Sequence, residues 1–71
     1  MSTYLDLVAI INSLSSGIPV EITVKWCTDQ GLIVNPILVK KWGKLIYDDH
    51  KALGLLYLGK TSNNLHHYSK I

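Results

Sequence analysis

The chain contains no arginine, because all seven of its basic residues are lysines, set against five acidic residues. The resulting net charge of +2 is too small to indicate a polyanionic partner by itself. Without arginine, the chain also lacks the side chain that best reads guanine through two parallel hydrogen bonds. Any binding to nucleic acid should therefore depend on shape and phosphate contacts more than on base edges.

Cysteine is almost absent as well, since Cys27 is the only one in the chain. A single cysteine excludes an intrachain disulfide framework and a zinc site of cysteines and histidines, and it favours a reducing, intracellular setting. The apolar stretch at residues 5–14 is interrupted by Asp6 and Asn12 and follows no basic segment. It therefore fits neither a signal peptide nor a membrane span.

Charged residues are few, and the composition is that of a globular protein. Charged residues make up 17% of the 71-residue chain and hydrophobic residues 48%, which is a globular composition. A chain of this length buries only roughly 60% of the surface that its unfolded form exposes. We therefore expect one domain over residues 1–71, built around one core.

The clearest local signal is a helix over residues 4–15. Its apolar residues gather within about one third of a helical wheel, and they are Leu7, Ile10, Ile11 and Leu14. Thr3 can cap the first turn together with Asp6, in a variant of the capping box. The segment Ser15-Ser16-Gly17 ends the helix, and Pro19 follows.

The next stretch, residues 19–31, fits two interpretations. Apolar and polar residues alternate from Val20 to Trp26, which is typical of a strand. Thr23, however, is a good helix N-cap, and Gly31 is a natural residue just beyond a helix C-terminus. A short strand at 19–22 followed by a helix near 24–31 satisfies both patterns.

A third helix is predicted over residues 36–49, because Asn35-Pro36 is a strong N-terminal signal. On the wheel one side is apolar, with Leu38, Trp42, Leu45 and Ile46. The other side is polar, with Lys40, Lys41, Lys44, Asp48 and Lys51. Gly43 should destabilise this helix by about 1 kcal/mol relative to Ala. The alternative is a hairpin that turns at residues 42–45, with strands on both sides.

The C-terminal third is predicted to be a two-stranded ribbon. Residues 55–58 form a short apolar run between two glycines, and 65–70 resume an extended pattern. The polar cluster at 60–64 between them is typical of a turn.

The segment from Thr23 to Leu45 resembles a helix-turn-helix. Cys27 falls where these motifs have a small residue facing the neighbouring helix, and Gly31 falls in the turn, before apolar Leu32. Leu38, Trp42 and Leu45 fall where the recognition helix packs on the core. With a helix before it and the ribbon after it, the whole chain resembles a winged helix-turn-helix domain. That is a small α+β fold of three helices and a C-terminal two-stranded wing.

The resemblance implies a non-enzymatic protein that binds double-stranded DNA and regulates transcription. Helix 36–49 would enter the major groove as the recognition helix, and the 55–71 ribbon would be the wing. The residues placed toward DNA are Asn35, Ile37, Lys40, Lys41 and Lys44 on the helix, and Lys60, Asn63 and Asn64 at the wing tip. The alternative for each lysine is a solvated surface position without a partner.

A module this small buries little surface on DNA, so we expect a homodimer or repeated binding along the duplex. Stand-alone domains of this kind resemble products of phages, viruses or mobile elements. We therefore expect the protein to act in the cytoplasm, that of the host cell if the source is viral, without a membrane partner.

Other chemistry-bearing residues have simpler interpretations. Trp26 and Trp42 could stack on single-stranded nucleic acid, but the wheel favours the core for Trp42. The consecutive residues 48–50 (Asp-Asp-His) point in different directions on a helix and cannot form one catalytic or metal site unaided. His66 and His67 face opposite sides of a strand, and Cys27 is most simply a small buried residue. We expect no catalytic residues, no metal and no cofactor.

Two alternatives remain. If 20–26 and 37–47 are strands, the chain is a small α/β protein that masks a partner protein as an inhibitor or accessory subunit. A sheet edge or an exposed tryptophan would then be its contact. The passage from the first helix into residues 19–22 is also similar to Sm-like proteins, which implies a small RNA-binding barrel.

Overall fold

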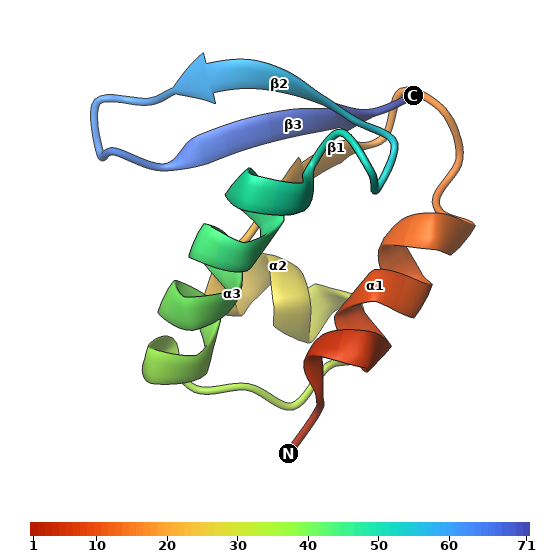
Figure 1. Ribbon diagram of the computed structural model, residues 1–71. Coiled ribbons are helices and arrows are strands. Elements are labelled where there is room, and N and C mark those ends of the chain that lie inside the picture. The colour runs from red at the N-terminus through yellow and green to blue at the C-terminus, as the bar shows by residue number, and fades with distance from the viewer.

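The computed structural model describes all residues, 1–71, as three helices and one three-stranded antiparallel sheet (Figure 1). In chain order the elements are α1 (Tyr4–Ser13), β1 (Pro19–Glu21), α2 (Val24–Asp29), α3 (Pro36–Asp49), β2 (Leu55–Lys60) and β3 (His66–Lys70). The sheet covers one end of the helices, and β2 and β3 form a hairpin that extends to one side (Figure 1). The predicted small α+β class is confirmed.

The N-terminal capping box of α1 forms as predicted. The Thr3 hydroxyl accepts a hydrogen bond from the amide of Asp6 (3.3 Å), and the Asp6 carboxylate accepts one from the amide of Thr3 (2.9 Å). The helix ends two residues before the predicted position, because Leu14 already has extended backbone. Its amide still bonds to the carbonyl of Ile11, and this bond closes the last turn.

The structure resolves residues 19–31 into a short strand and a short helix. The Thr23 hydroxyl accepts a hydrogen bond from the amide of Trp26 (3.0 Å), so the local cap overrides the strand-like alternation. The helix ends at Asp29, short of the predicted 31, because Gly31 adopts a φ of +87°. The amides of Gly31 and Leu32 bond back to the carbonyls of Thr28 and Cys27, which is a Schellman motif.

Helix α3 has the bounds that the sequence predicts. The side-chain oxygen of Asn35 accepts a hydrogen bond from the amide of Leu38 (2.8 Å), and Pro36 occupies the first turn. The alternative in which 20–26 and 37–47 are strands is therefore wrong, and so is the barrel. The buried stripe of α3 is rotated slightly from the predicted one, since its buried residues are Val39, Trp42 and Ile46, with Leu38 and Leu45 half-buried.

The predicted two-stranded ribbon is in fact part of a three-stranded sheet with the order β1-β3-β2. Strand β1 pairs antiparallel with β3, placing Val20 opposite Tyr68, and β2 pairs with the other edge of β3, placing Tyr57 opposite the same tyrosine. Both hairpin strands also differ from the predicted 55–58 and 65–70. This pairing between distant segments has no local sequence signal.

One core of eleven buried residues lies between the helices and the sheet. Its members are Leu7, Ile11, Val20, Ile22, Cys27, Leu32, Val39, Trp42, Ile46, Leu55 and Tyr68. Trp42 is 1% exposed, so its predicted place in the core is confirmed and it is no stacking platform. Trp26 is half-buried and packs against the same core. None of the helices has the length and apolar character to cross a membrane.

Replacing Trp42 by Ala should destabilise the fold by about 3–5 kcal/mol, as truncation of buried aromatic residues does. A domain of this size has a total stability of only about 5 kcal/mol, so the variant should be largely unfolded. Urea denaturation followed by circular dichroism measures this. Ile37→Ala, at an 82% exposed position on the same helix, is the control and should change stability little. A Trp42→Ala variant as stable as the wild type would contradict the prediction.

Candidate functional site

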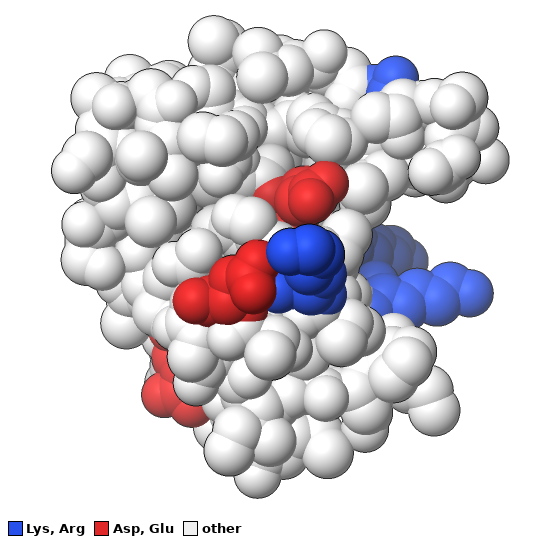
Figure 2. Space-filling model, turned by 180° about the vertical axis from the view of Figure 1, so that it is seen from behind, with Lys and Arg blue, Asp and Glu red and all other residues white.

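The exposed side of α3 carries three lysines near the middle of the helix. Lys40, Lys41 and Lys44 are all exposed, and Ile37 in the preceding turn is more exposed than any other large hydrophobic residue. None of the three lysines has a carboxylate oxygen within 4.0 Å, whereas Lys25 on α2 pairs with Asp29 at 3.2 Å. Figure 2 shows lysine side chains projecting from one edge of the molecule, below the surface formed by the hairpin.

The hairpin carries the second group of the predicted residues. Lys60 ends β2, and Asn63 and Asn64 lie in the following turn, all three exposed. Asn64 has a φ of +60°, and its amide bonds to the carbonyl of Thr61 (3.0 Å). Asparagine adopts this left-handed conformation more readily than most residues. The backbone of the turn therefore explains why asparagine stands at position 64.

Asn35 has a structural role of the same kind. Its side-chain oxygen caps α3, and its side-chain nitrogen lies 3.5 Å from the sulfur of Met1. The residue is half-buried, in contrast to the exposed lysines that follow it. The cap thus explains why asparagine stands at position 35.

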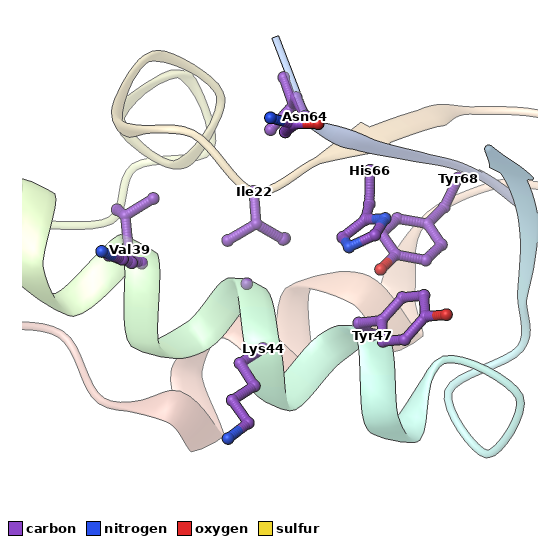
Figure 3. Close-up of a pocket in the computed structure, with 10 residues that line it drawn as sticks. Ile22, Val39, Lys44, Tyr47, Asn64, His66 and Tyr68 are labelled. Atoms are coloured by element: carbon purple, nitrogen blue, oxygen red, sulfur yellow. The ribbon is translucent and has the colours of Figure 1, made fainter. Parts of the chain in front are cut away.

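A cavity of about 350 Å³ separates α3 from the tip of the hairpin (Figure 3). Its lining brings together two of the predicted lysines and one predicted asparagine, and it consists of Ile22, Val39, Lys40, Gly43, Lys44, Tyr47, Asn64, Leu65, His66 and Tyr68. The cavity therefore links the exposed side of α3 to the hairpin turn. In Figure 3, Lys44 runs outward from the helix, while Ile22 and Val39 form the opposite, apolar part.

Aromatic side chains close one end of the cavity. The His66 ring stacks on Tyr47 from α3, with ring centroids 4.3 Å apart and an interplanar angle of 19°. A hydrogen bond of 2.7 Å joins Nδ1 of His66 to the hydroxyl of Tyr57. His67 faces the other side of the sheet, where its Nε2 lies 3.6 Å from a carboxylate oxygen of Glu21. The predicted opposite orientation of the two histidines is therefore confirmed.

The hydroxyl of Tyr68 is the unusual polar group of this site. The residue is only 1% exposed, and its hydroxyl has no hydrogen-bond partner among the groups of the protein. Burial raises the pKa of Tyr68 to about 12, with a further contribution from the charges of Tyr57, Tyr47 and Asp48. The hydroxyl is therefore neutral at physiological pH and able to donate or accept a hydrogen bond.

Gly43 lies in the middle of α3, where it borders the same cavity. Its backbone is not in the left-handed region, and a Cβ atom placed on it would meet no heavy atom within 4 Å. Neither backbone geometry nor close packing thus requires glycine at this position. Its observable effect is to leave space between the helix and the hairpin.

Comparison with known protein families, with curated proteins and with solved structures found no match to this chain.

The remaining chemistry-bearing residues do not converge on a site. No group of three or more His, Cys, Asp or Glu side chains is placed to share a metal ion. Nδ1 of His50 lies 2.7 Å from the carbonyl oxygen of Tyr47, and the His50 ring has no carboxylate oxygen within 4.0 Å. Cys27 is fully buried, as predicted, and burial raises the pKa of its thiol.

The cavity and its aromatic end do not follow from the sequence patterns. These patterns assign no role to Tyr47, Tyr57 and Tyr68, and for His66 they predict only that it faces the side of the strand opposite to His67. One signal is present, because His66 and Tyr68 are two residues apart on a strand and so share a face. Their alignment with Tyr47 depends on how β3 lies over α3, which no local pattern specifies.

The pKa of Tyr68 predicts a loss of stability in alkali. Below pH 10 its hydroxyl is neutral in the folded and unfolded states alike. Between pH 10 and 12 the unfolded chain ionises while the folded one does not, so the free energy of unfolding should fall by roughly 2–3 kcal/mol. Urea denaturation across this range measures the fall. Tyr68→Phe lacks this group and should lose less stability; an equal loss would contradict the assignment.

Replacing Gly43 by Ala should stabilise the protein by roughly 0.5–1 kcal/mol. The new methyl group meets open space, so the gain in helix propensity is not offset by a clash. Thermal unfolding measures the change. Gly31→Ala is the matched control and should destabilise the protein, because Gly31 has a φ of +87°.

Proposed function

We propose that the chain is a small, non-enzymatic DNA-binding regulatory protein of the winged-helix type. In this proposal α3 enters the major groove as the recognition helix, and the β2–β3 hairpin is the wing. The resemblance in the sequence supports the proposal, as does the short strand β1 before α2, a feature that such domains have. The pairing of β1 with β3 adds a third strand at the base of the hairpin.

The observation that carries the proposal is the set of three exposed lysines on one side of α3. A lysine that pairs with a neighbouring carboxylate contributes little to binding a phosphate, but Lys40, Lys41 and Lys44 have no such neighbour. Their ammonium groups are free to neutralise phosphates, which supplies much of the affinity of proteins for DNA. Lys40 and Lys44 also line one cavity together with Asn64 of the hairpin turn, so α3 and the hairpin could contact one duplex.

The remaining exposed residues on this side suit the same role. Ile37 stands one turn before the lysines and is 82% exposed, which places an apolar side chain where it could contact a thymine methyl group. Lys60 and Asn63 extend the polar surface onto the hairpin, near the DNA backbone or the minor groove. Asn35 and Asn64 would contribute through groups that the helix cap and the turn leave unused.

Specificity should be modest for a single copy. The chain has no arginine for bidentate base contacts, and one small module buries little DNA surface. A homodimer on two half-sites, or several copies along the duplex, would raise the affinity. We propose that the protein works in one of these ways.

Replacing Lys40, Lys41 and Lys44 together by Ala should abolish DNA binding and leave the fold intact. All three side chains are exposed, so truncating them removes charge without opening a cavity in the core. For each phosphate that the variant no longer neutralises, the slope of log affinity against log salt should flatten by roughly 0.9. Fluorescence anisotropy with duplex DNA at several salt concentrations measures both effects.

Two controls make this result specific. The triple replacement by Arg keeps the charge and should retain salt-dependent binding. Lys25→Ala combined with Lys51→Ala removes charge from α2 and from beyond the end of α3, and it should change binding much less. Lys60→Ala should have a smaller effect than the triple variant, of the same sign. If the wild-type protein shows no salt-dependent DNA binding even at low ionic strength, the proposal is wrong.

A second candidate function is masking of a partner protein, which one observation favours. Strand β2 is an edge of the sheet, and its Leu56 and Leu58 are 53% and 59% exposed. An edge strand with exposed apolar side chains is suited to pairing with another chain. The contact would be this edge and not a tryptophan, since neither tryptophan is exposed.

The two functions are separated by variants on different surfaces. Leu56→Lys combined with Leu58→Lys should leave DNA binding unchanged if the lysines of α3 carry the function. If masking is the function, capture of a specific partner from lysate should be lost with this double variant and retained with the lysine triple variant.

A further inference from the structure

We propose that the exposed side of α3 selects DNA by the 5-methyl groups of its pyrimidines, and so prefers duplexes that carry thymine or 5-methylcytosine. The inference rests on the proposed function, because it names the class of DNA that α3 recognises. It is drawn from three observations: the surroundings of Ile37, the kinds of side chain that α3 lacks, and the placement of the lysines around Ile37.

Ile37 lies among the lysines of α3. At about 100° per residue, Lys40, Lys41 and Lys44 all fall within about 60° of it around the helix axis. One hollow of the surface brings these side chains together, and the residues that line it are Ile37, Lys40, Lys41, Lys44, Leu45 and Asp48. A polyanion that binds the three ammonium groups must therefore also meet an apolar side chain.

The side chain of Ile37 is both exposed and held in place. It is 82% exposed and follows Pro36 in the first turn of α3, where the side-chain oxygen of Asn35 accepts a hydrogen bond from the amide of Leu38 (2.8 Å). A β-branched side chain on a helix has one strongly preferred χ1 rotamer. Contact with a partner would therefore remove apolar surface from water while ordering little that is not already ordered.

Helix α3 lacks the side chains that most often read base edges through hydrogen bonds. It contains no Arg, Asn, Gln, Ser or Thr, and the side-chain oxygen of Asn35 before it is used as the cap. Asp48, the one acidic residue of the hollow, lies about three turns beyond Ile37. In the major groove the apolar feature of a base edge is the 5-methyl group of thymine. Cytosine methylated at the same ring position presents the same group, so Ile37 should contact either base.

The lysines are placed to hold Ile37 over the bases. Lys40 and Lys41 lie on opposite flanks of Ile37 around the helix axis, and Lys44 runs outward from the helix (Figure 3). None of the three has a carboxylate oxygen within 4.0 Å. A helix with its side chains is about 10–12 Å across and the major groove about 12 Å wide. Flexible lysines on both flanks therefore reach phosphates at the groove walls, while Ile37 between them faces the base edges.

The test compares two duplexes of A·T pairs that differ only in the methyl group, one with thymine and one with uracil at every thymine position. Fluorescence anisotropy should show tighter binding to the thymine duplex, by about fourfold for each methyl group contacted, which corresponds to about 0.8 kcal/mol. Both affinities should fall as salt rises, because phosphate contacts release counterions. Their ratio should stay constant, since a methyl contact releases none.

A second duplex pair and two variants assign the effect. A mixed-sequence duplex should bind more tightly when its cytosines carry a 5-methyl group than when they do not. Ile37→Ala should bind the thymine and uracil duplexes equally and keep the salt dependence, because its lysines are intact. Leu5→Ala, which removes a side chain of similar exposure (76%) from α1, is the matched control and should retain the preference for thymine.

Equal binding of the two A·T duplexes by the wild type, or a preference that Ile37→Ala retains, would overturn this inference and leave the DNA-binding proposal intact. So would a preference for G·C pairs that cytosine methylation does not change, because the lysines would then be reading guanine. If the wild type binds no duplex even at low ionic strength, the proposed function itself is wrong. Salt-dependent binding to vesicles of anionic phospholipid, without binding to DNA, would overturn both proposals.

Discussion

The pairing of β1 with β3 is the constraint on which the rest of the structure depends. It joins a short segment near the N-terminus to the last strand, so that β3 has a hydrogen-bonded neighbour on both edges. Hydrogen bonds of 2.7 and 2.9 Å, from Gly17 to Lys70 and from Lys70 to Ile18, extend the pairing. Burial of Tyr68 follows, because it lies in the central strand with Val20 and Tyr57 on either side.

That position of Tyr68 also sets the geometry of the cavity. The side chains of β3 alternate, so burying Tyr68 places His66 on the same face, toward α3, and His67 on the other. The stacking of His66 on Tyr47 then fixes the hairpin relative to the helix at one end of the gap. Toward the turn, Gly43 offers no side chain to the hairpin, and the two elements remain apart.

Local signals in the sequence predict the helices well, because each begins at a side-chain cap. Thr3, Thr23 and Asn35 all make the predicted bonds, and Gly31 ends α2 through its positive φ. The short strand at 19–22 is also predicted, but its pairing with β3 could not be, since that partner lies far away in the sequence. Likewise, the wheel of α3 predicts the exposed lysines, but the cavity and the orphaned hydroxyl of Tyr68 depend on the relative position of two elements.

A residue that the fold requires for a cap or a turn says little about function. The predicted site residues therefore fall into two groups, those that the fold requires and those that it does not. Asn35 is required as a helix cap and Asn64 by a left-handed turn. By contrast, no packing, cap or ion pair requires Lys40, Lys41, Lys44 or an exposed Ile37, and nothing in the fold requires Gly43. All five lie on α3, and three of the five border one cavity beside the hairpin. Residues that the fold does not explain, gathered on one side of one helix, are what supports the proposal that this side of the molecule meets a partner.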